Sequence, residues 1–288
     1  MDCSAPALRC RQIGEADIAI VAALLKQGFP NRTQQFWRDA LRRLAHREPP
    51  PGFPKYGFLL ERGEVPVGAI LMICSTLRQG DRVATRCNLS SWYVAPEYRA
   101  YASLLVSHAL SHKDVTYMNV SAAPHTWPII EAQGFAPYCE GIFIALPALK
   151  RSNEAVRILD ATQTPTAPFE ASDRDLLQRH AELGCISLWC ENAERAHPFV
   201  FRPRLAKRIV PCAQLIYCSD VADLVHFAGP VGRYLARRGR PFVVIDSNGA
   251  IPGLFGRFQA GSMAKYFKGP QRPRLGDLAY TEYALLAV

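Results

Sequence analysis

The stretch of sequence that decides the fold is residues 92–99, which read Trp-Tyr-Val-Ala-Pro-Glu-Tyr-Arg. Apolar residues before and within it predict a strand over about 82–94. Pro96 ends this strand, because a proline nitrogen carries no hydrogen for a β-ladder. We expect a helix over about 100–113 to follow, with a buried face made of Tyr101, Leu104, Leu105 and Leu110. The stretch is therefore the turn of a strand–turn–helix.

The elements around this turn predict a mixed α/β sheet. We expect strands at about 9–13, 56–61, 65–75, 82–94, 115–120 and 139–146, and helices at about 15–27, 33–45, 100–113 and 124–133. One crossover is expected to be parallel, from the strand that ends at Val94 to the strand that starts at Val115. Parallel neighbours in an otherwise antiparallel sheet can separate at their C-terminal ends, so we expect a ligand cleft at residues 94–103.

The chemistry of this cleft suits a ligand with a pyrophosphate. A strand that ends abruptly leaves unpaired backbone groups near Tyr93 and Val94, and the following helix presents its free N–H groups. Arg99 adds a cation at the start of that helix. An extended arm can pair with the strand, and its pyrophosphate can lie at the helix start.

The same residues resemble a family motif. Residues 94–99, followed by a helix with Leu104 and Leu105, are similar to the Val-x-Pro-x-x-Arg-Gly-x-Gly-x-Gly segment of the GNAT superfamily of acyl-CoA N-acyltransferases. Residues 133–135, Gln-Gly-Phe, look like the Gly-Phe that ends the last helix of that family. The resemblance covers about residues 8–147 and agrees with the expected order of elements.

The resemblance implies transfer of an acyl group from coenzyme A to an amine of a small molecule or peptide, without a metal. In this family a backbone N–H, here that of Val94, polarises the thioester carbonyl. The residues that the resemblance implies for binding coenzyme A are Tyr93, Val94, Arg99, Ala100, Tyr101, Ala102 and Ser103.

Several positions depart from the family pattern. Glycines let the backbone approach a phosphate closely, but the three small positions of the motif are Ala100, Ala102 and Leu104 here. The frequent catalytic tyrosine is replaced by Ile130, and a common general-base position by Asn88, which takes no proton at neutral pH. These departures favour the alternative that the chain is a catalytically inactive GNAT-fold binding or assembly protein.

A general base must then come from another residue. We expect His125, because a helix start near the end of a cleft strand faces the ligand. A surface or capping histidine is the alternative interpretation. The other candidates are Glu61 and a water molecule held by Ser90, Ser91, Tyr117 and Asn119.

The second half repeats the order of elements. We expect a helix at about 172–183, strands at 186–191, 198–202 and 209–218, a long helix at 221–238, a strand at 242–246, a helical piece around 254–258, and strands at 263–267 and 277–287. This predicts two tandem GNAT-like domains, 1–148 and 149–288, each a mostly antiparallel sheet with helices on both faces. Asp220 and Asp223 at the start of the long helix repel a pyrophosphate, so we expect catalysis in the first domain.

Composition and charge fit a folded chain of 288 residues with 49% hydrophobic and 20% charged residues. The net charge of +9 is spread over both halves, which disfavours nucleic-acid binding. The longest apolar run, 67–74, is far shorter than the roughly 20 residues that cross a bilayer, and the N-terminus does not resemble a secretion signal. Nine cysteines without a Cys-x-x-Cys pair predict reduced thiols. We predict a cytoplasmic protein and leave a homodimer open.

Overall fold

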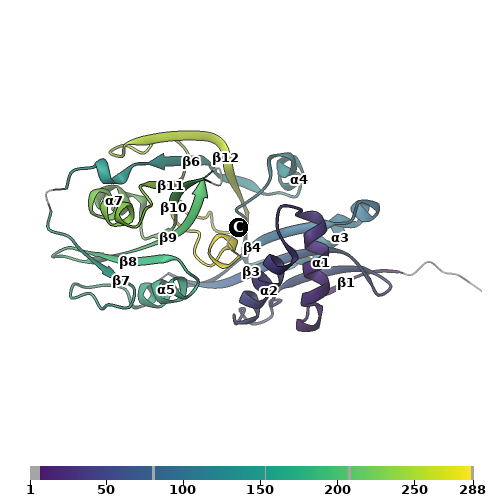
Figure 1. Ribbon diagram of the computed structural model, residues 1–288. Helices are drawn as coiled ribbons and strands as arrows, with labels where there is room; N and C mark the ends of the chain where they lie inside the picture. The colour runs from purple at the N-terminus through teal and green to yellow at the C-terminus, as the bar shows by residue number, and fades with distance from the viewer. Residues whose placement is uncertain (1–6, 80–81, 153, 207–208, 287–288) are drawn as a thin grey trace, which may run out of the picture. The chain divides into compact units, whose positions relative to one another are not determined.

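The computed structural model describes residues 7–79, 82–152, 154–206 and 209–286. These residues form two compact units. The first contains residues up to 120, residues 267–272 and the residues from 285 onward, and the second contains residues 121–266 and 273–284. In each unit helices pack against a mixed β-sheet (Figure 1).

The sheet of the first unit is an antiparallel meander with one parallel strand beside it. Its strands are β1 (Leu8–Gln12), β2 (Gly57–Arg62), β3 (Val65–Gln79), β4 (Arg82–Val94) and β5 (Val115–Asn119). They lie in sequence order, antiparallel from β1 to β4 and parallel between β4 and β5. The expected meander and its parallel crossover are confirmed.

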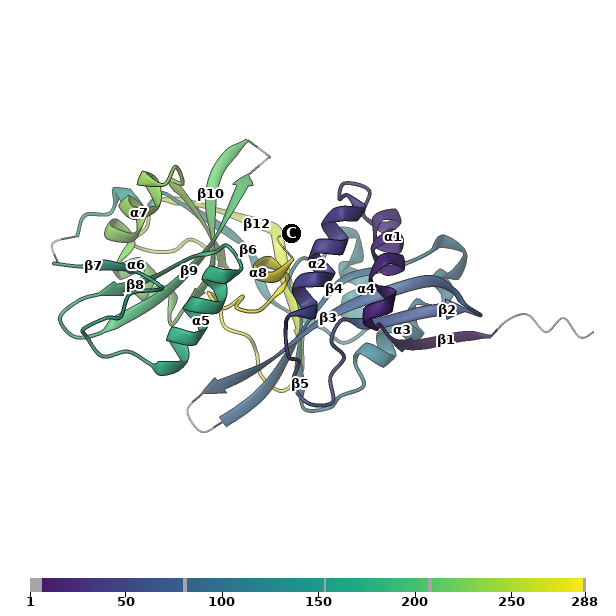
Figure 2. The ribbon, with the colours of Figure 1, turned by 60° about the horizontal axis from the view of Figure 1, so that its bottom comes forward.

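Helices cover both faces of this sheet. They are η1 (Glu15–Asp17), α1 (Ile18–Gly28), α2 (Gln34–Ala45), η2 (Pro96–Tyr101) and α3 (Ala102–Ala109). α1 and α2 lie on one face and α3 on the other (Figure 2). Thr33 caps α2 by accepting a hydrogen bond from the Phe36 N–H, and Trp37, Leu41 and Leu44 of α2 are buried. This apolar stripe is why α2 packs against the rest of the unit.

One pair of cysteines corrects the expectation of reduced thiols. Cys74 of β3 and Cys87 of β4 lie opposite each other in the antiparallel ladder and form a disulfide. The other cysteines that the structure describes are free, and all of them except Cys10 are buried. Spacing rules could not find this pair, because the register of the β3–β4 hairpin, and not a short motif, brings the two sulfurs together.

The sheet of the second unit has the same plan. Its strands are β6 (Ala136–Ala145), β7 (Arg157–Asp160), β8 (Ile186–Glu191), β9 (Ala196–Ala206), β10 (Val210–Cys218), β11 (Phe242–Ser247) and β12 (Gly256–Lys268). Strands β7 to β10 are antiparallel neighbours in sequence order, β10 and β11 are parallel, and β6 pairs with the far edge of β11. The last two residues of β12 belong to the first unit.

The helices of the second unit include the expected helix near 172–183, but its expected long helix is divided in two. They are η3 (Pro124–Thr126), α4 (Trp127–Ala132), η4 (Pro147–Leu149), α5 (Ala171–Glu182), α6 (Val221–His226), α7 (Ala228–Arg237) and α8 (Glu282–Leu285), whose last residue belongs to the first unit. The expected long helix breaks at Phe227, since Pro230 fits only the first turn of a new helix. No helix among the described residues combines the length and apolar character needed to cross a membrane.

Two further expectations for the second half are wrong. Residues 254–258 are not helical, and β12 begins at Gly256. Residues 277–286 do not form a regular strand but carry a single β-bridge at Asp277 and then α8, while residue 287 lies outside the described residues. Both segments have apolar residues without a clear period, and such short runs do not distinguish a strand from a helix.

The core of the second unit lies between α6, α7 and one face of the sheet. Its members include Leu188, Cys190, Phe199, Phe201, Leu215, Leu224, Phe227, Val231, Leu235 and Val243, all of them buried. A Cβ at Gly232 of α7 would lie 2.2 Å from the Ala148 nitrogen, so glycine permits the close packing of α7 on η4.

The two compact units do not divide the chain between residues 148 and 149. Residues 121–148 fall in the second unit, because β6 pairs with β11. Compact units need not coincide with the copies of a fold along the sequence. The expected limits of two GNAT-like copies, 1–148 and 149–288, therefore stay a prediction.

Candidate functional site

The two parallel strands of the first unit separate beyond the pair Asn88–Met118. β4 and β5 pair from Thr85–Val115 to Asn88–Met118, where the ladder ends. The side chain of Asn88, a residue that is 1% exposed, donates to the carbonyl oxygens of Leu89 at 2.9 Å and of Met118 at 3.4 Å. Asn88 therefore holds the main chain at the point where the strands part.

A β-bulge in β4 follows directly. The pairing with β3 shifts between Leu71–Ser90 and Ala69–Tyr93, so β4 carries an extra residue. Ser91 has a φ of +51°, a left-handed conformation that is uncommon outside glycine. A bulge bends its strand and increases the local twist, which re-aims the residues after it. Sequence analysis missed this bulge, although two adjacent serines in an apolar strand were a local signal.

Beyond the bulge, β4 presents a backbone donor on the side of β5. The Ala95 N–H donates to the Val67 carbonyl of β3 at 2.8 Å. Because successive residues of an extended chain point to opposite sides, the Val94 N–H points away from β3. On that side the ladder with β5 has already ended at Asn88–Met118, so β5 offers the Val94 N–H no ladder acceptor. The cleft expected at residues 94–103 therefore begins with a donor outside the β4–β5 ladder.

The turn after Val94 is the 3₁₀ helix η2. The Tyr98 N–H donates to the Ala95 carbonyl at 2.9 Å, and α3 begins at Ala102. The Arg99 side chain is exposed, and it forms no hydrogen bond or ion pair within the described part of the chain. A guanidinium at this position is available to an anionic ligand.

The residues that replace the motif glycines lie at the surface. Ala100 and Ser103 are exposed, and Ala102 is partly buried. Tyr101 and Leu104 were expected to be buried, but they are 47% and 36% exposed. The reason is that η2 delays the start of α3 and changes its phase, so its buried residues are Leu105, Val106 and Ala109. Leu104 is therefore not buried in the interior of the unit.

Two contacts support the turn. The Tyr93 ring lies against Gly28 at the end of α1, where a Cβ would be 2.4 Å from Cδ2 of Tyr93. Arg62 of β2 donates to the Tyr98 hydroxyl at 3.3 Å, with its guanidinium carbon 5.8 Å from the ring centre. A second cation thus lies beside η2.

The expected base His125 is exposed in η3 and belongs to the second unit. Its role therefore stays a prediction. Ile130 of α4 is 3% exposed, so a core side chain stands where the family often has a tyrosine. Within the described ranges, no group of three or more His, Cys, Asp and Glu side chains could hold a metal ion.

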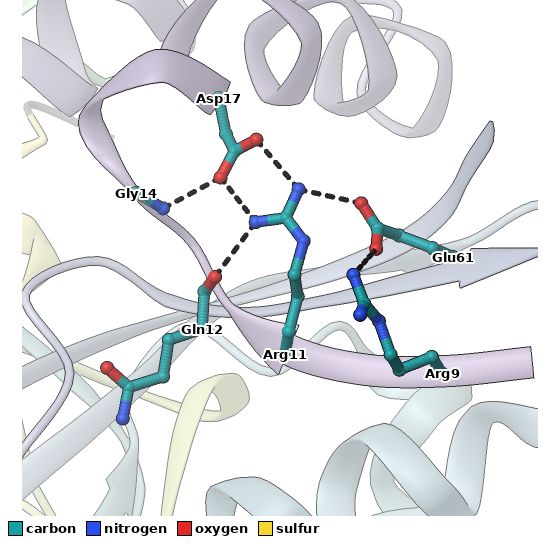
Figure 3. Close-up of polar contacts among 6 residues, drawn as sticks. All are labelled: Arg9, Arg11, Gln12, Gly14, Asp17 and Glu61. Atoms are coloured by element: carbon teal, nitrogen blue, oxygen red, sulfur yellow. Dashed lines mark hydrogen bonds and ion pairs between the residues drawn. The ribbon is translucent and has the colours of Figure 1, made fainter. Parts of the chain in front are cut away.

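The alternative base Glu61 is held as a carboxylate by two arginines (Figure 3). Arg11 lies 2.6 Å from its Oε1 and Arg9 lies 3.2 Å from its Oε2. Arg11 also makes two hydrogen bonds to Asp17, which accepts a third from the Gly14 N–H. The hydrogen bond from Arg11 lowers the pKa of Glu61 despite its burial. Glu61 is thus a poor proton acceptor, and its network joins β1, β2 and the start of α1.

Comparison with solved structures identifies the fold. A GCN5-related N-acetyltransferase from Anabaena variabilis matches with a TM-score of 0.59 at 11% identity, over 91% of this chain and 72% of that chain. A putative acetyltransferase from Pyrococcus horikoshii matches with a TM-score of 0.58 at 12% identity, over 96% and 95%. The chain has the GNAT fold. A GCN5-related N-acetyltransferase from Kribbella flavida matches with a TM-score of 0.56 at 15% identity, over 93% and 72%. No family model and no curated protein matches the chain.

The GNAT fold confirms the resemblance that residues 94–99 carried. Each of the three matches covers more than nine tenths of the chain, so the likeness extends over residues of both units. In the first unit, the parted strands β4 and β5, the bulge and the Val94 N–H lie together before η2.

Proposed function

We propose that the chain is an acyl-CoA-dependent N-acyltransferase that acts on an amine of a small molecule or peptide, with its coenzyme A site in the first unit. The observation that carries the proposal is the Val94 N–H, which points away from β3 and lies where the ladder between β4 and β5 has ended. The GNAT fold supports the same class of reaction. A cytoplasmic location and a homodimer stay predictions.

The residues proposed to hold coenzyme A follow the chain from β4 into α3. They are Tyr93, Val94, Arg99, Ala100, Tyr101, Ala102 and Ser103. Arg99 and the neighbouring Arg62 supply positive charge for the pyrophosphate, and the exposed position of Leu104 keeps its side chain out of the protein interior. Backbone groups of β4 beyond the bulge can pair with the amides of an extended arm.

The proposed reaction is direct transfer. The amine nitrogen attacks the thioester carbonyl carbon, the new C–N bond forms, and the C–S bond breaks to release the thiolate. The Val94 N–H donates to the carbonyl oxygen as negative charge develops there. The amine proton passes to a base, for which we propose His125. Asn88 takes no proton and positions β4 instead.

A catalytically inactive GNAT-fold binding or assembly protein is the second candidate. It is favoured by the buried Ile130 and by the lowered pKa of Glu61, since neither can move a proton at neutral pH.

Titration calorimetry with acetyl-CoA and longer acyl-CoAs tests the proposal. We expect binding in the wild type, a loss of at least tenfold in affinity for Arg99→Glu, and a change of less than twofold for Arg42→Glu, an exposed arginine of α2 that serves as the matched control. Release of free thiol in the presence of a panel of amines then reports transfer. Absence of binding by every acyl-CoA contradicts the proposal, whereas binding without thiol release from any amine supports the inactive alternative.

A further inference from the structure

The second unit repeats the local geometry of the candidate cleft. β10 and β11 run parallel from Cys212–Phe242 to Gln214–Val244, and the ladder ends there. The pairing of β10 with β9 shifts directly afterwards, so that β10 carries the extra residue Ile216. Parallel strands thus part beside a bulge in this unit as well, and a helix again follows the bulged strand.

Individual residues of the two clefts correspond. Gln214, like Asn88, is a 1% exposed amide in the last parallel pair. The residue that corresponds to Val94 is Cys218, the last residue of the bulged strand. Its N–H is therefore the counterpart of the proposed oxyanion donor.

In the second unit this donor is already paired. The Cys218 N–H donates to the Gly276 carbonyl at 3.0 Å, and the Leu278 N–H donates to the Ile216 carbonyl at 2.7 Å. Tyr217 and Asp277 form an antiparallel β-bridge between these two bonds. Residues 276–278 of the chain thus act as a short strand on the edge of β10.

Side chains fix this segment in place. Arg274 donates to the Cys218 carbonyl at 2.6 Å, and the Tyr280 N–H donates to Nε2 of the buried His180 at 3.1 Å. Leu278 is 1% exposed. Gly276 has a φ of +76°, and a Cβ there would lie 2.8 Å from Sγ of Cys218. The segment therefore packs against β10 too closely for another chain or ligand to enter between them.

Polar groups that follow the last parallel pair of β10 and β11 also have partners within the unit. Lys265 of β12 and Asp246 of β11 form a buried ion pair at 2.8 Å, and the Tyr283 ring centre lies 5.6 Å from the Lys265 nitrogen. Asp220 caps α6, because its carboxylate accepts the Ala222 N–H at 2.9 Å. A pyrophosphate would meet this carboxylate and that of Asp223.

We propose that residues 274–283 are an intramolecular segment that fills the coenzyme-A-type cleft of the second unit, so that each chain takes up one acyl-CoA, in the first unit. The ratio of one acyl-CoA per chain rests on the proposed function. The filling of the cleft by residues 274–283 does not depend on it. The second unit is then a GNAT fold closed by its own chain. The segment pairs with the edge of β10. The corresponding edge of β4 stays available to a ligand.

Hydrogen exchange of the full chain, read by mass spectrometry, tests both parts. In the ligand-free protein we expect the amides of residues 216–218 and 278 to be protected as strongly as the paired residues of β9. Saturating acetyl-CoA is expected to protect residues 92–99 and to leave 216–218 unchanged, with one ligand per chain by calorimetry. Rapid exchange of 216–218 without ligand, new protection there with ligand, or two ligands per chain overturns the inference. No response of 92–99 contradicts the proposed function alone.

Two glycine variants separate the contact from backbone strain. Gly276→Ala and Gly239→Ala both place a side chain at a positive φ, which is +76° at Gly276 and +73° at Gly239. A Cβ at Gly276 would have neighbours within 4 Å, whereas a Cβ at Gly239 would have none among the described residues. We expect Gly276→Ala to speed exchange of residues 216–218 at least tenfold and Gly239→Ala to leave it within twofold. Equal exchange in the two variants contradicts the inference. If Gly276→Ala does not fold, the wild-type protection decides the question by itself.

Discussion

Replacement of Lys265 by methionine is expected to destabilise the second unit strongly. Lys265 is 0% exposed and Asp246 is 3% exposed, and their charged atoms lie 2.8 Å apart. Burial alone would lower the pKa of Lys265, but the Asp246 carboxylate raises it. Burial raises the pKa of Asp246, and the Lys265 cation opposes this shift. Lys265→Met leaves a buried carboxylate without its partner and removes the donor of the Met263 carbonyl.

The magnitude follows from distance and burial. At an effective dielectric constant of about 20, two unit charges at this separation attract by about 6 kcal/mol. Desolvation of both charges offsets much of that, and the loss of one partner of such a pair typically costs about 3–5 kcal/mol. We expect a smaller loss at pH 5 than at pH 8. Burial raises the pKa of Asp246 above its unfolded value, and loss of the Lys265 cation removes the opposing influence, so the stability of the variant is lost as pH rises.

Hydrogen exchange of peptides from β11 measures the opening free energy of this unit, because a chain with two compact units need not unfold in one step. The double variant Asp246→Leu, Lys265→Met should lose less stability than Lys265→Met, with a coupling of at least about 2 kcal/mol. Asp39→Asn, which breaks the exposed pair with Arg42 at 3.5 Å, is the control and should cost less than about 1 kcal/mol. Additive effects of the two single changes would refute the reasoning.

Glu191 is expected to make the second unit sensitive to acid. Burial opposes its charge, but hydrogen bonds from the N–H groups of residues 166 and 167 and from Arg157 outweigh this and lower its pKa to about 2. The stabilisation by Glu191 is therefore present above the unfolded pKa of 4.5 and lost as pH falls towards 2. Glu191→Gln should make the urea unfolding midpoint less dependent on pH between these two values, whereas the exposed Glu194→Gln should leave that dependence unchanged. Gly28→Ala should destabilise the first unit by about 1–3 kcal/mol in thermal melts, since the new Cβ meets the Tyr93 ring, and unchanged or higher stability would contradict the close contact.

The sequence predicted most of the elements of the first unit and the place of the candidate cleft. Pro96 stops β4 whatever surrounds it, because proline has no N–H to donate, and the apolar periods of α1 and α2 already contained their buried faces. The parallel crossover to β5 followed from the order of elements. Local chemistry of this kind acts over a few residues and can be predicted from a single sequence.

Phase and length were predicted less well. Tyr101 and Leu104 were assigned to a buried face because α3 was expected to begin earlier, but a 3₁₀ turn rotates the helix that follows it. The long helix of the second half breaks at Phe227, because Pro230 is accommodated only in the first turn of a helix, and the sequence alone could have shown this.

The sequence by itself therefore determined the strand–turn–helix at residues 92–99 and the mixed α/β fold class. Only the tertiary structure decided which backbone donors stay open. The bulge at Ser91, the disulfide between Cys74 and Cys87, and the pairing of Gly276 with Cys218 all depend on register or on contacts between distant segments. Whether the Val94 N–H or the Cys218 N–H finds a partner is set by where another part of the chain comes to lie, and no short sequence pattern encodes that.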